Sequence, residues 1–556
     1  MPKKINKQLL ISAGVLFAIL LLVDRYYWAQ LSQWREDQAT NIWLGYTADI
    51  RNIPVGLISS QLIPNPNGMI LLGFLLSALP NLLTVSFLLG VVQIILLVLV
   101  GWKSFAGDWQ YILFATIPSL ASVILRSTSV EFWNQYTITL INVFFLFWAL
   151  RYLENRSLWN IPPIIVLILL APSLYLAGIV NAIVIALLTV GIMAYKRPTL
   201  DNIGAVLVVT IMLVLLSVFL TWLPYFQNIN LNQITNYNKT RLGPVIMFQA
   251  VWESFFGLPI YGTMQWADRT TFASAFKHSD PRILSYSTQI LLRLAGRAYL
   301  LQAAFAFTAF IYAILGSLAK GISTGTFDAK INFSIARMVA LSAIFICLSY
   351  AFSTWLGGPA WIKGERLDQT VQYLPMFLYL IFLLPWMITQ GAKTEKTIRI
   401  ISYGSLIIFC AFNVTSGVMI IRDHLQYRGT ALTEADVPLI DKMQATEFIA
   451  DDWSKHSESN VVPVDYDLGG GLWDWVSDFG SRFKRWYSAP MTEGRGFDYE
   501  LLRRYGLVNY QEGIQSRNFG AARYLITYAF EDPPQVADGR MTHHIFGRLR
   551  VSVVER

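Results

Sequence analysis

Residues 206–223 read VLVVTIMLVLLSVFLTWL, an apolar run that contains no charged residue. A helix needs about 20 predominantly apolar residues to cross the hydrocarbon core of a bilayer, and this run has that scale. The chain holds four more blocks that are mainly apolar, at residues 9–23, 87–100, 138–150 and 398–421. The run therefore predicts a membrane-spanning helix, and its recurrence predicts a polytopic α-helical membrane protein.

The composition of the whole chain agrees with this prediction. Of its 556 residues, 54% are hydrophobic and 14% are charged, whereas a soluble domain carries roughly 25% charged residues. The net charge of +8 does not indicate a nucleic-acid partner, because the basic residues lie between the apolar blocks. Lysine and arginine are enriched in the cytoplasmic loops of membrane proteins.

The basic residues also predict the topology. Lys3, Lys4 and Lys7 precede the first block, so we expect a cytoplasmic N-terminus and an uncleaved first span at about residues 8–24. The run Met69 to Leu79 is too short to span, and we predict that it is an interfacial helix. The chain then has about eleven spans, and four basic segments fall on the cytoplasmic side: 151–156, 196–197, 320–337 and 393–399.

The residues after the last span change in character, with charges every few positions. Residues 434–456 have a helical period, and residues 461–466, 524–528 and 549–554 are typical of strands. We therefore predict two domains. Residues 1–422 form a transmembrane domain with interfacial helices in its first outer loop, and residues 423–556 form a soluble extracytoplasmic α/β domain.

The predicted outer face comprises four segments before the C-terminal domain, and the first two contain the acidic residues that we single out. The first loop, 24–83, contains Glu36 and Asp37, and the short turn 126–131 ends at Glu131. Acidic residues close to a membrane are costly unless they stay wetted, and they are often functional. The other two segments, 224–294 and 357–372, carry cations: Lys277, His278, Arg282, Lys363 and Arg366.

This order of features resembles the GT-C glycosyltransferases, which take a sugar from a polyprenyl-phosphate carrier. The resemblance is greatest to the branch of aminoarabinose transferases and protein mannosyltransferases. Members of that branch carry Asp-Glu and a small residue in the first outer loop, and here Asp37-Gln38-Ala39 occupies that place. The family's second acid matches Glu131, which follows Arg126-Ser127-Thr128-Ser129.

The chain departs from the family pattern at three positions. Gln38 replaces the usual Glu, which weakens the inference of a metal site built from paired carboxylates. The family's Pro-Pro-Leu segment is matched only loosely by residues 64–68, PNPNG. Gln372 stands in place of the Arg in an Arg-Tyr-Leu-x-Pro-like segment, so we expect a basic role to have moved to Lys363 or Arg366.

The resemblance implies a glycosyltransferase of the cell (inner) membrane that acts on the extracytoplasmic face. Asp37 would be the general base and Glu131 a second catalytic acid, and no cofactor is implied with certainty. A departing lipid phosphate needs cations, for which Arg366, Lys363, Lys277, His278 and Arg282 are the candidates. The partners would be a polyprenyl-phosphate-linked sugar, membrane lipids, and a glycan, lipid or protein acceptor.

Two other functions fit parts of the pattern. A lipid-sugar flippase or transporter would explain the spans, but it predicts charged or broken helices at mid-membrane, and the predicted spans are nearly free of charge. An O-antigen ligase or polymerase would use one long outer loop, for which 224–294 is a candidate. Such enzymes lack a C-terminal domain of this size. The sequence does not identify the sugar, the acceptor or the carrier phosphate.

Overall fold

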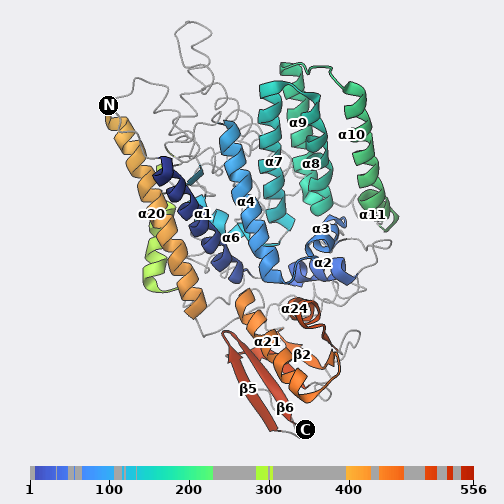
Figure 1. Ribbon diagram of the computed structural model, residues 1–556, viewed down its shortest axis with the longest axis vertical. Coiled ribbons are helices and arrows are strands. Elements are labelled where there is room, and N and C mark those ends of the chain that lie inside the picture. The colour runs from blue at the N-terminus through green and yellow to red at the C-terminus, as the bar shows by residue number, and fades with distance from the viewer. Residues whose placement is uncertain are drawn as a thin grey trace, which may run out of the picture.

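The computed structural model describes residues 7–32, 34, 36–47, 56, 65–104, 116–117, 120–132, 134–228, 284–298, 301–302, 304, 396–426, 437–468, 495–509, 523–529 and 540–555. These residues form a bundle of long helices with a small α/β domain at one end (Figure 1). We refer to the end of the bundle that carries the α/β domain as the domain end, and to the other as the far end.

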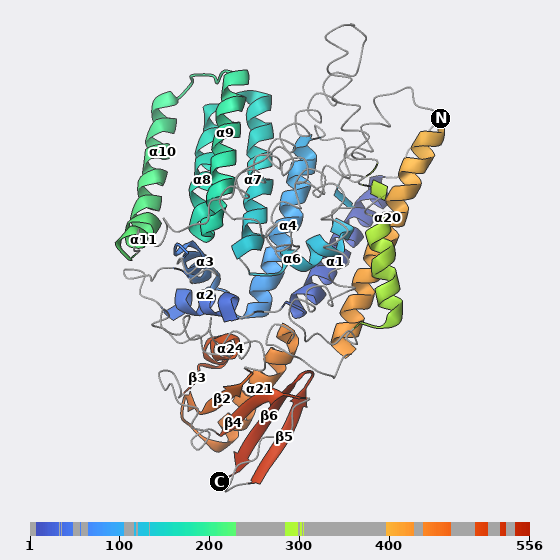
Figure 2. The same cartoon turned by 180° about the vertical axis from the view of Figure 1, so that it is seen from behind.

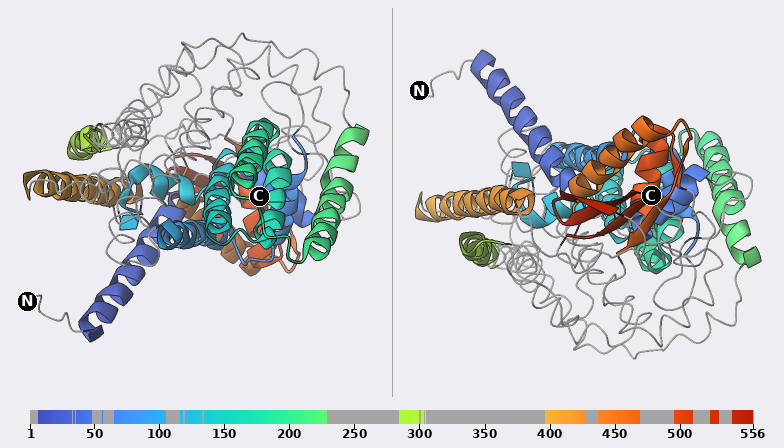
Figure 3. Two further views of the ribbon diagram at one scale, coloured as in Figure 1. Left: turned by 90° about the horizontal axis from the view of Figure 1, so that it is seen from above. Right: turned by 90° about the horizontal axis from the view of Figure 1, so that it is seen from below.

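The described part of the bundle includes long helices that run between its two ends. Viewed along the bundle, α1 and α20 extend to one side and α10 to the other (Figure 3). In α8, Pro162 and Pro163 lie in the first turn, where the missing N–H groups have no intrahelical partner to lose. The bounds are α1 Lys7–Gln30, α4 Leu82–Ser104, α7 Asn134–Asn155, α8 Ile161–Leu174, α9 Ile179–Tyr195, α10 Ile203–Ser217 and α20 Lys396–Gln426.

Apolar side chains cover the outside of α10. Helix α10 continues through the π-turn η4 (Val218–Trp222) into α11 (Leu223–Asn228). Along this continuous segment, more than half of the surface of each of three apolar residues is exposed: Leu207, Met212 and Phe219. Exposed apolar surface on this scale is unfavourable in water and suits a lipid environment. Within the described residues, three helical segments are long and apolar enough to cross a membrane: Leu82–Trp102, Ile203–Gln227 and Tyr403–Gln426. The protein is an integral membrane protein.

The two ends of the bundle differ in charge in the way that the topology requires. The starts of α1 and α20, the end of α7 and the α9–α10 connection lie at the far end (Figure 1). These are the places of the basic segments near Lys7, Arg151, Lys196 and Lys396. The C-terminal domain lies at the opposite end, as the sequence predicted. Which end faces the cytoplasm, and the total of about eleven spans, stay predictions.

Two short helices lie at the domain end of the bundle, beneath α8 in the views of Figures 1 and 2. They are α2 (Glu36–Thr47) and α3 (Gly68–Leu76). At 9 residues, α3 is too short to cross a bilayer, which confirms a short helix at this place. The two helices are packed backbone to backbone, because a Cβ on Gly45 would meet Phe74 N and one on Gly73 would lie 2.6 Å from Asn41 O.

The C-terminal domain contains a mixed sheet in the order β2-β4-β6-β5. Strand β2 is parallel to β4, and the pairs β4–β6 and β6–β5 are antiparallel, with Ile526 opposite Val551. A separate parallel pair joins β1 (Val461–Val462) and β3 (Val508–Asn509). The strands predicted from sequence at 461–466, 524–528 and 549–554 are confirmed. The bounds of the sheet strands are β2 Val464–Asp467, β4 Tyr524–Tyr528, β5 Arg540–Phe546 and β6 Leu549–Glu555.

Two helices, α21 (Leu439–His456) and α24 (Arg495–Tyr505), pack with this sheet around one apolar core that includes Ile449, Leu501 and Ile526. Asp441 of α21 receives a hydrogen bond from Arg548 N at 3.0 Å in the β5–β6 turn. The neighbouring Gly547 has φ +60, and a Cβ there would meet the Asp441 carboxylate. Only glycine satisfies both the backbone angle and the space. The helix predicted over 434–456 is thus confirmed from Leu439 onward.

Three predicted boundaries are wrong. Helix α1 continues to Gln30, so the predicted first loop begins with nearly two helical turns. The predicted turn at Arg126 is helical, because α6 spans Val123–Ser129 and is capped by the Ser122 hydroxyl. Helix α20 ends at Gln426, past the boundary that we expected between 422 and 423. In each case the helix extends into polar residues, which an apolar pattern does not detect.

Candidate functional site

The predicted base, Asp37, lies in the first turn of α2, next to Glu36. The backbone of both residues is described, and their side chains lie outside the described part. Acidic residues are favoured in the first turn of a helix because the N-terminal end carries partial positive charge. Helix α2 therefore begins at the acidic pair, at the domain end of the bundle (Figure 1).

Trp34 fixes the chain just before α2. Its backbone has φ 42, a left-handed conformation that is costly for a bulky residue and persists only where the surroundings impose it. The surroundings do so in three ways. The indole is fully buried, it donates from Nε1 to the Ser86 hydroxyl at 2.8 Å, and it stacks on Phe132 with centroids 5.6 Å apart.

The second predicted acid, Glu131, is next to α2. Its Oε2 accepts a hydrogen bond from Gln38 Nε2 at 3.1 Å, and Gln38 is almost fully buried. Phe132, which stacks on Trp34, follows Glu131 directly in the chain. Two outer segments that are about ninety residues apart in sequence are thus joined by one polar and one aromatic contact.

The C-terminal domain holds the same segment from the other side. Lys442 of α21 is fully buried, and its Nζ donates to the Trp34 carbonyl at 2.9 Å. The ammonium also lies over the Phe497 ring at 5.7 Å. One turn of chain earlier, Leu439 N donates to Ser32 O at 2.9 Å. The loop that leads into α2 is therefore held between the bundle and the domain.

Helix α24 makes a second set of contacts with the bundle. Arg503 donates to two backbone carbonyls, those of Ala78 and Leu79, each at 3.2 Å. Glu500 is fully buried and accepts a hydrogen bond from Leu82 N at 2.6 Å, at the start of α4. Burial raises the pKa of Glu500 to about 7, against the opposing effects of the Leu82 N–H and of Arg504.

The predicted Pro/Asn-rich entry to α3 is attached to the bundle by two asparagines. Asn65 Oδ1 accepts from Leu176 N at 3.0 Å, after the end of α8. Asn67 Nδ2 donates to Leu220 O at 3.0 Å, within the π-turn that follows α10. These bonds satisfy backbone groups at helix ends and breaks, which would otherwise be costly in an apolar environment. They also attach the α2–α3 pair to α8 and α10.

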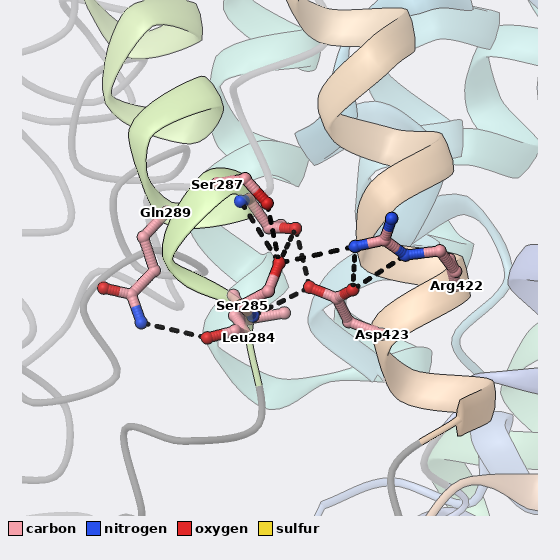
Figure 4. Close-up of polar contacts among 7 residues, drawn as sticks. Leu284, Ser285, Ser287, Gln289, Arg422 and Asp423 are labelled. Carbon is pink, nitrogen blue, oxygen red and sulfur yellow. Dashed lines mark hydrogen bonds and ion pairs between the residues drawn. The ribbon is translucent and has the colours of Figure 1, made fainter.

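A further polar cluster lies at the domain end of α20 (Figure 4). Asp423 Oδ2 accepts from Ser285 N at 2.8 Å and from Thr288 Oγ1 at 2.6 Å, at the start of the helix 286–298. Arg422 Nη2 donates to Asp423 Oδ1 at 2.7 Å. Because the carboxylate is saturated by these donors, the cluster joins two helices and leaves no evident capacity for a substrate.

The five cations predicted to bind the lipid phosphate lie outside the described residues: Lys277, His278, Arg282, Lys363 and Arg366. Their roles stay predictions. In the part of the chain that is described, no group of three His, Cys, Asp or Glu side chains is placed to hold a metal ion. Of the two predicted catalytic acids, the structure places the backbone of one and the complete side chain of the other.

Sequence reasoning missed two residues that organise this site. Trp34 lies in the predicted first loop, 24–83, but a tryptophan close to a membrane surface is common and does not indicate a buried role. Lys442 lies in a helix whose apolar period was recognised, and its position 408 residues from Trp34 made the contact unpredictable. One signal for Lys442 was available in the sequence. A lysine within the apolar face of an amphipathic helix indicates a buried charge that needs a partner.

Fold and site together define an integral membrane protein whose acidic segments lie at the end of the helix bundle that carries a C-terminal α/β domain. No family model matches the sequence, and no curated protein sequence matches it. Among solved structures, the chain is similar to the crystal structure of ArnT from Cupriavidus metallidurans bound to undecaprenyl phosphate. The match covers 97% of this chain and 98% of that one, with 13% sequence identity and a TM-score of 0.34. A score below 0.5 is too low to transfer function.

Proposed function

We propose that the chain is a membrane glycosyltransferase that moves a sugar from a polyprenyl-phosphate carrier to an acceptor on the extracytoplasmic face. The observation that carries the proposal is the hydrogen bond from Gln38 to Glu131. It brings the loop of the proposed base, Asp37, and the second acidic segment to one place at the domain end of a membrane bundle. The sequence resemblance to GT-C enzymes supplies the reaction class.

The proposed reaction is a displacement at the anomeric carbon of the donor sugar. The acceptor hydroxyl gives its proton to the Asp37 carboxylate, and its oxygen forms a bond to the anomeric carbon. The bond between that carbon and the phosphate oxygen breaks, and the polyprenyl phosphate leaves with the bonding electron pair. General-base assistance of this kind contributes about 10²–10⁴-fold to the rate.

Gln38 suits a second carboxylate in this site. Its amide donates a hydrogen bond to Glu131 and adds no second negative charge, whereas a Glu at position 38 would face Glu131 with like charge. In this proposal, Glu131 orients the acceptor or the sugar. The predicted cations, Arg366, Lys363, Lys277, His278 and Arg282, stabilise the departing phosphate.

The test uses purified full-length protein and a synthetic polyprenyl-phosphate-linked sugar, with release of the sugar or its transfer measured over time. Asp37→Asn should lower the rate by at least about 10²-fold, because the amide keeps the size of the side chain and loses its basicity. Donor binding and membrane insertion should be unchanged. No sugar release by the wild-type protein from any such donor would contradict the proposal.

Glu36→Gln is the matched control, since it removes an adjacent carboxylate in the same helical turn. It should lower the rate much less than Asp37→Asn. If the two variants exchange these effects, the base is Glu36 and the alignment with the family is displaced by one residue. If neither variant loses activity, the first outer loop does not supply the base.

A further inference from the structure

Two arginines and one aspartate lie together at the domain end of the bundle, where α1, α6 and α20 meet. Asp24 Oδ2 accepts from Arg25 Nη1 at 2.7 Å and from Arg126 Nε at 3.0 Å, and Asp24 Oδ1 accepts from Arg126 Nη2. Arg126 also donates from Nη1 to Asn413 O of α20 at 3.3 Å, and it lies over the Trp28 ring. One carboxylate therefore serves two guanidinium groups, which leaves an excess positive charge.

Arg25 uses only one end of its guanidinium. Its Nη1 binds Asp24, while Nε and Nη2 have no hydrogen-bond partner among the described residues. Nε and Nη2 lie on the same edge of the planar group, and this edge donates two parallel hydrogen bonds to the oxygens of a carboxylate or phosphate. The unused part of Arg25 is thus a complete two-point binding edge for an oxyanion.

Such an edge is costly to leave empty. Arg25 is 0% exposed, and an unsatisfied buried donor is destabilising, more so on a charged group. Charged residues near the hydrocarbon core are costly too, and they mark functional sites when they occur. Asp24 remains 19% exposed, so the cluster reaches the surface at that residue.

The position of Arg25 relates it to the candidate site. The Arg25 stem packs on α4 at Gly90, where a Cβ would lie 3.0 Å from Arg25 Cδ and 3.2 Å from Val130 Cγ1. Val130 directly precedes Glu131, the acid that Gln38 binds. The stem of Arg25 is therefore close to the segment that carries the second acid.

We propose that the free edge of Arg25 binds two oxygens of a phosphate group, with Arg126 supplying further positive charge. The ligand is a phosphate anion, either the monoester headgroup of a lipid phosphate or free inorganic phosphate in the outer medium. The choice of a lipid phosphate rests on the proposed function. The binding site itself does not, because it follows from the unused edge and the excess charge.

Dodecyl phosphate, an amphiphilic phosphate monoester, is the probe, and it is titrated into the full-length protein in a neutral detergent. The wild type should bind it, and Arg25→Lys should bind at least about tenfold more weakly, since a lysine keeps the charge and lacks the planar edge. Tenfold corresponds to about 1.4 kcal/mol. Arg422→Lys, a conservative change in the exposed arginine of Figure 4, should bind like the wild type.

The source of the phosphate follows from a second titration with inorganic phosphate. Competition by inorganic phosphate at similar concentration indicates a site for the free ion, while binding of dodecyl phosphate alone indicates a lipid headgroup site. Equal binding of the probe by the wild type and Arg25→Lys would overturn the proposal. So would the absence of binding of either phosphate to the wild type.

Two further measurements keep the proposal testable if Arg25→Lys does not fold. Arg25→Gln keeps a donor for Asp24 and loses the charge, so it should also bind the probe weakly. A structure of the wild-type protein with dodecyl phosphate should place the phosphate on Arg25, and a phosphate elsewhere overturns the proposal. Asp37→Asn should retain probe binding. If Asp37→Asn abolishes transfer while Arg25→Lys binds the probe normally, this inference fails and the proposed function stands. If Asp37→Asn transfers sugar normally while Arg25→Lys binds the probe weakly, the phosphate site stands and the proposed base is wrong.

Discussion

Buried charged side chains at the domain interface form hydrogen bonds with backbone groups, whereas those of the Asp24 cluster mainly form ion pairs with each other. Lys442 donates to the Trp34 carbonyl, and Glu500 accepts from the Leu82 N–H. In the cluster, Arg25 and Arg126 share the carboxylate of Asp24. A buried charge that binds a backbone group fixes the position of the chain. A cluster with more cations than anions has the capacity to bind an anion from outside.

The largest effect should follow from removing the shared carboxylate. Asp24→Asn leaves two buried guanidinium groups without a counter-charge, and breaking a buried ion pair in this way costs about 3–5 kcal/mol. The apparent melting temperature of the purified protein measures the loss. Added dodecyl phosphate should restore part of it if an anion binds Arg25, because a ligand that binds only the folded state stabilises it.

Asp201→Asn is the control for this prediction. Asp201 is an exposed residue in the α9–α10 connection at the far end, and the same chemical change there should leave the melting temperature within experimental error. An Asp24→Asn protein as stable as the wild type would show that the two guanidinium groups are compensated in another way, and the contrast between the two regions would disappear.

The second effect is a pH dependence of stability that comes from Glu500 at the interface between the domain and the bundle. Because burial raises the pKa of Glu500 to about 7 from 4.5, the folded state holds this proton more tightly than the unfolded state. Between pH 4.5 and about pH 7 the unfolded state binds fewer protons, so the free energy of unfolding falls as the pH rises. The total loss is roughly 3 kcal/mol, complete above the folded pKa.

Glu500→Gln should remove this dependence. A glutamine oxygen can still accept the hydrogen bond from Leu82 N, and the side chain does not ionise. The apparent melting temperature of Glu500→Gln should fall less than that of the wild type between pH 5 and 8. Glu447→Gln, at an exposed position of α21, should keep the wild-type slope. Equal slopes for Glu500→Gln and the wild type would mean that Glu500 is not buried as described.

The smallest of the three effects should come from Lys442→Met. Methionine keeps the apolar stem and removes the donor, so the Trp34 carbonyl loses this partner at a cost of about 1–3 kcal/mol. Because Trp34 precedes α2, we expect sugar transfer to fall together with stability. Lys455→Met changes an exposed lysine at the end of the same helix, and it should alter neither. Normal transfer in Lys442→Met would show that the domain does not position the loop.

Periodicity and length made much of this fold predictable. The apolar blocks at 87–100 and 206–223 lie in α4 and in α10 with its extension, and alternating residues marked β4 and β6. Asp37 and Glu131 were singled out from their place beside apolar blocks, and the contact of Gln38 with Glu131 brings their segments together. These features depend on local sequence, which a single chain reveals.

The remaining features depend on contacts between distant residues. Arg25 falls in the predicted first loop, 24–83, yet helix α1 continues through it and the residue is buried. Gln38 looked like the loss of a family acid, while in the structure it is a donor to Glu131. Residue type alone reveals neither role. The role of Gln38 depends on a partner more than ninety positions away, and the burial of Arg25 depends on where α1 ends.

The contact between Gly45 and Gly73 has a consequence for the depth at which the reaction takes place. Because no side chain separates the backbones at Gly45 and Gly73, α2 and α3 cannot separate or slide without losing this close contact. Helix α3 is in turn held at Gly68 against the Ser173 backbone of α8. We therefore expect the acidic turn of α2 to keep a constant distance from the bilayer midplane throughout turnover. Donor and acceptor must both reach that plane, so the length and flexibility of the acceptor, rather than movement of the base, should limit which molecules receive the sugar.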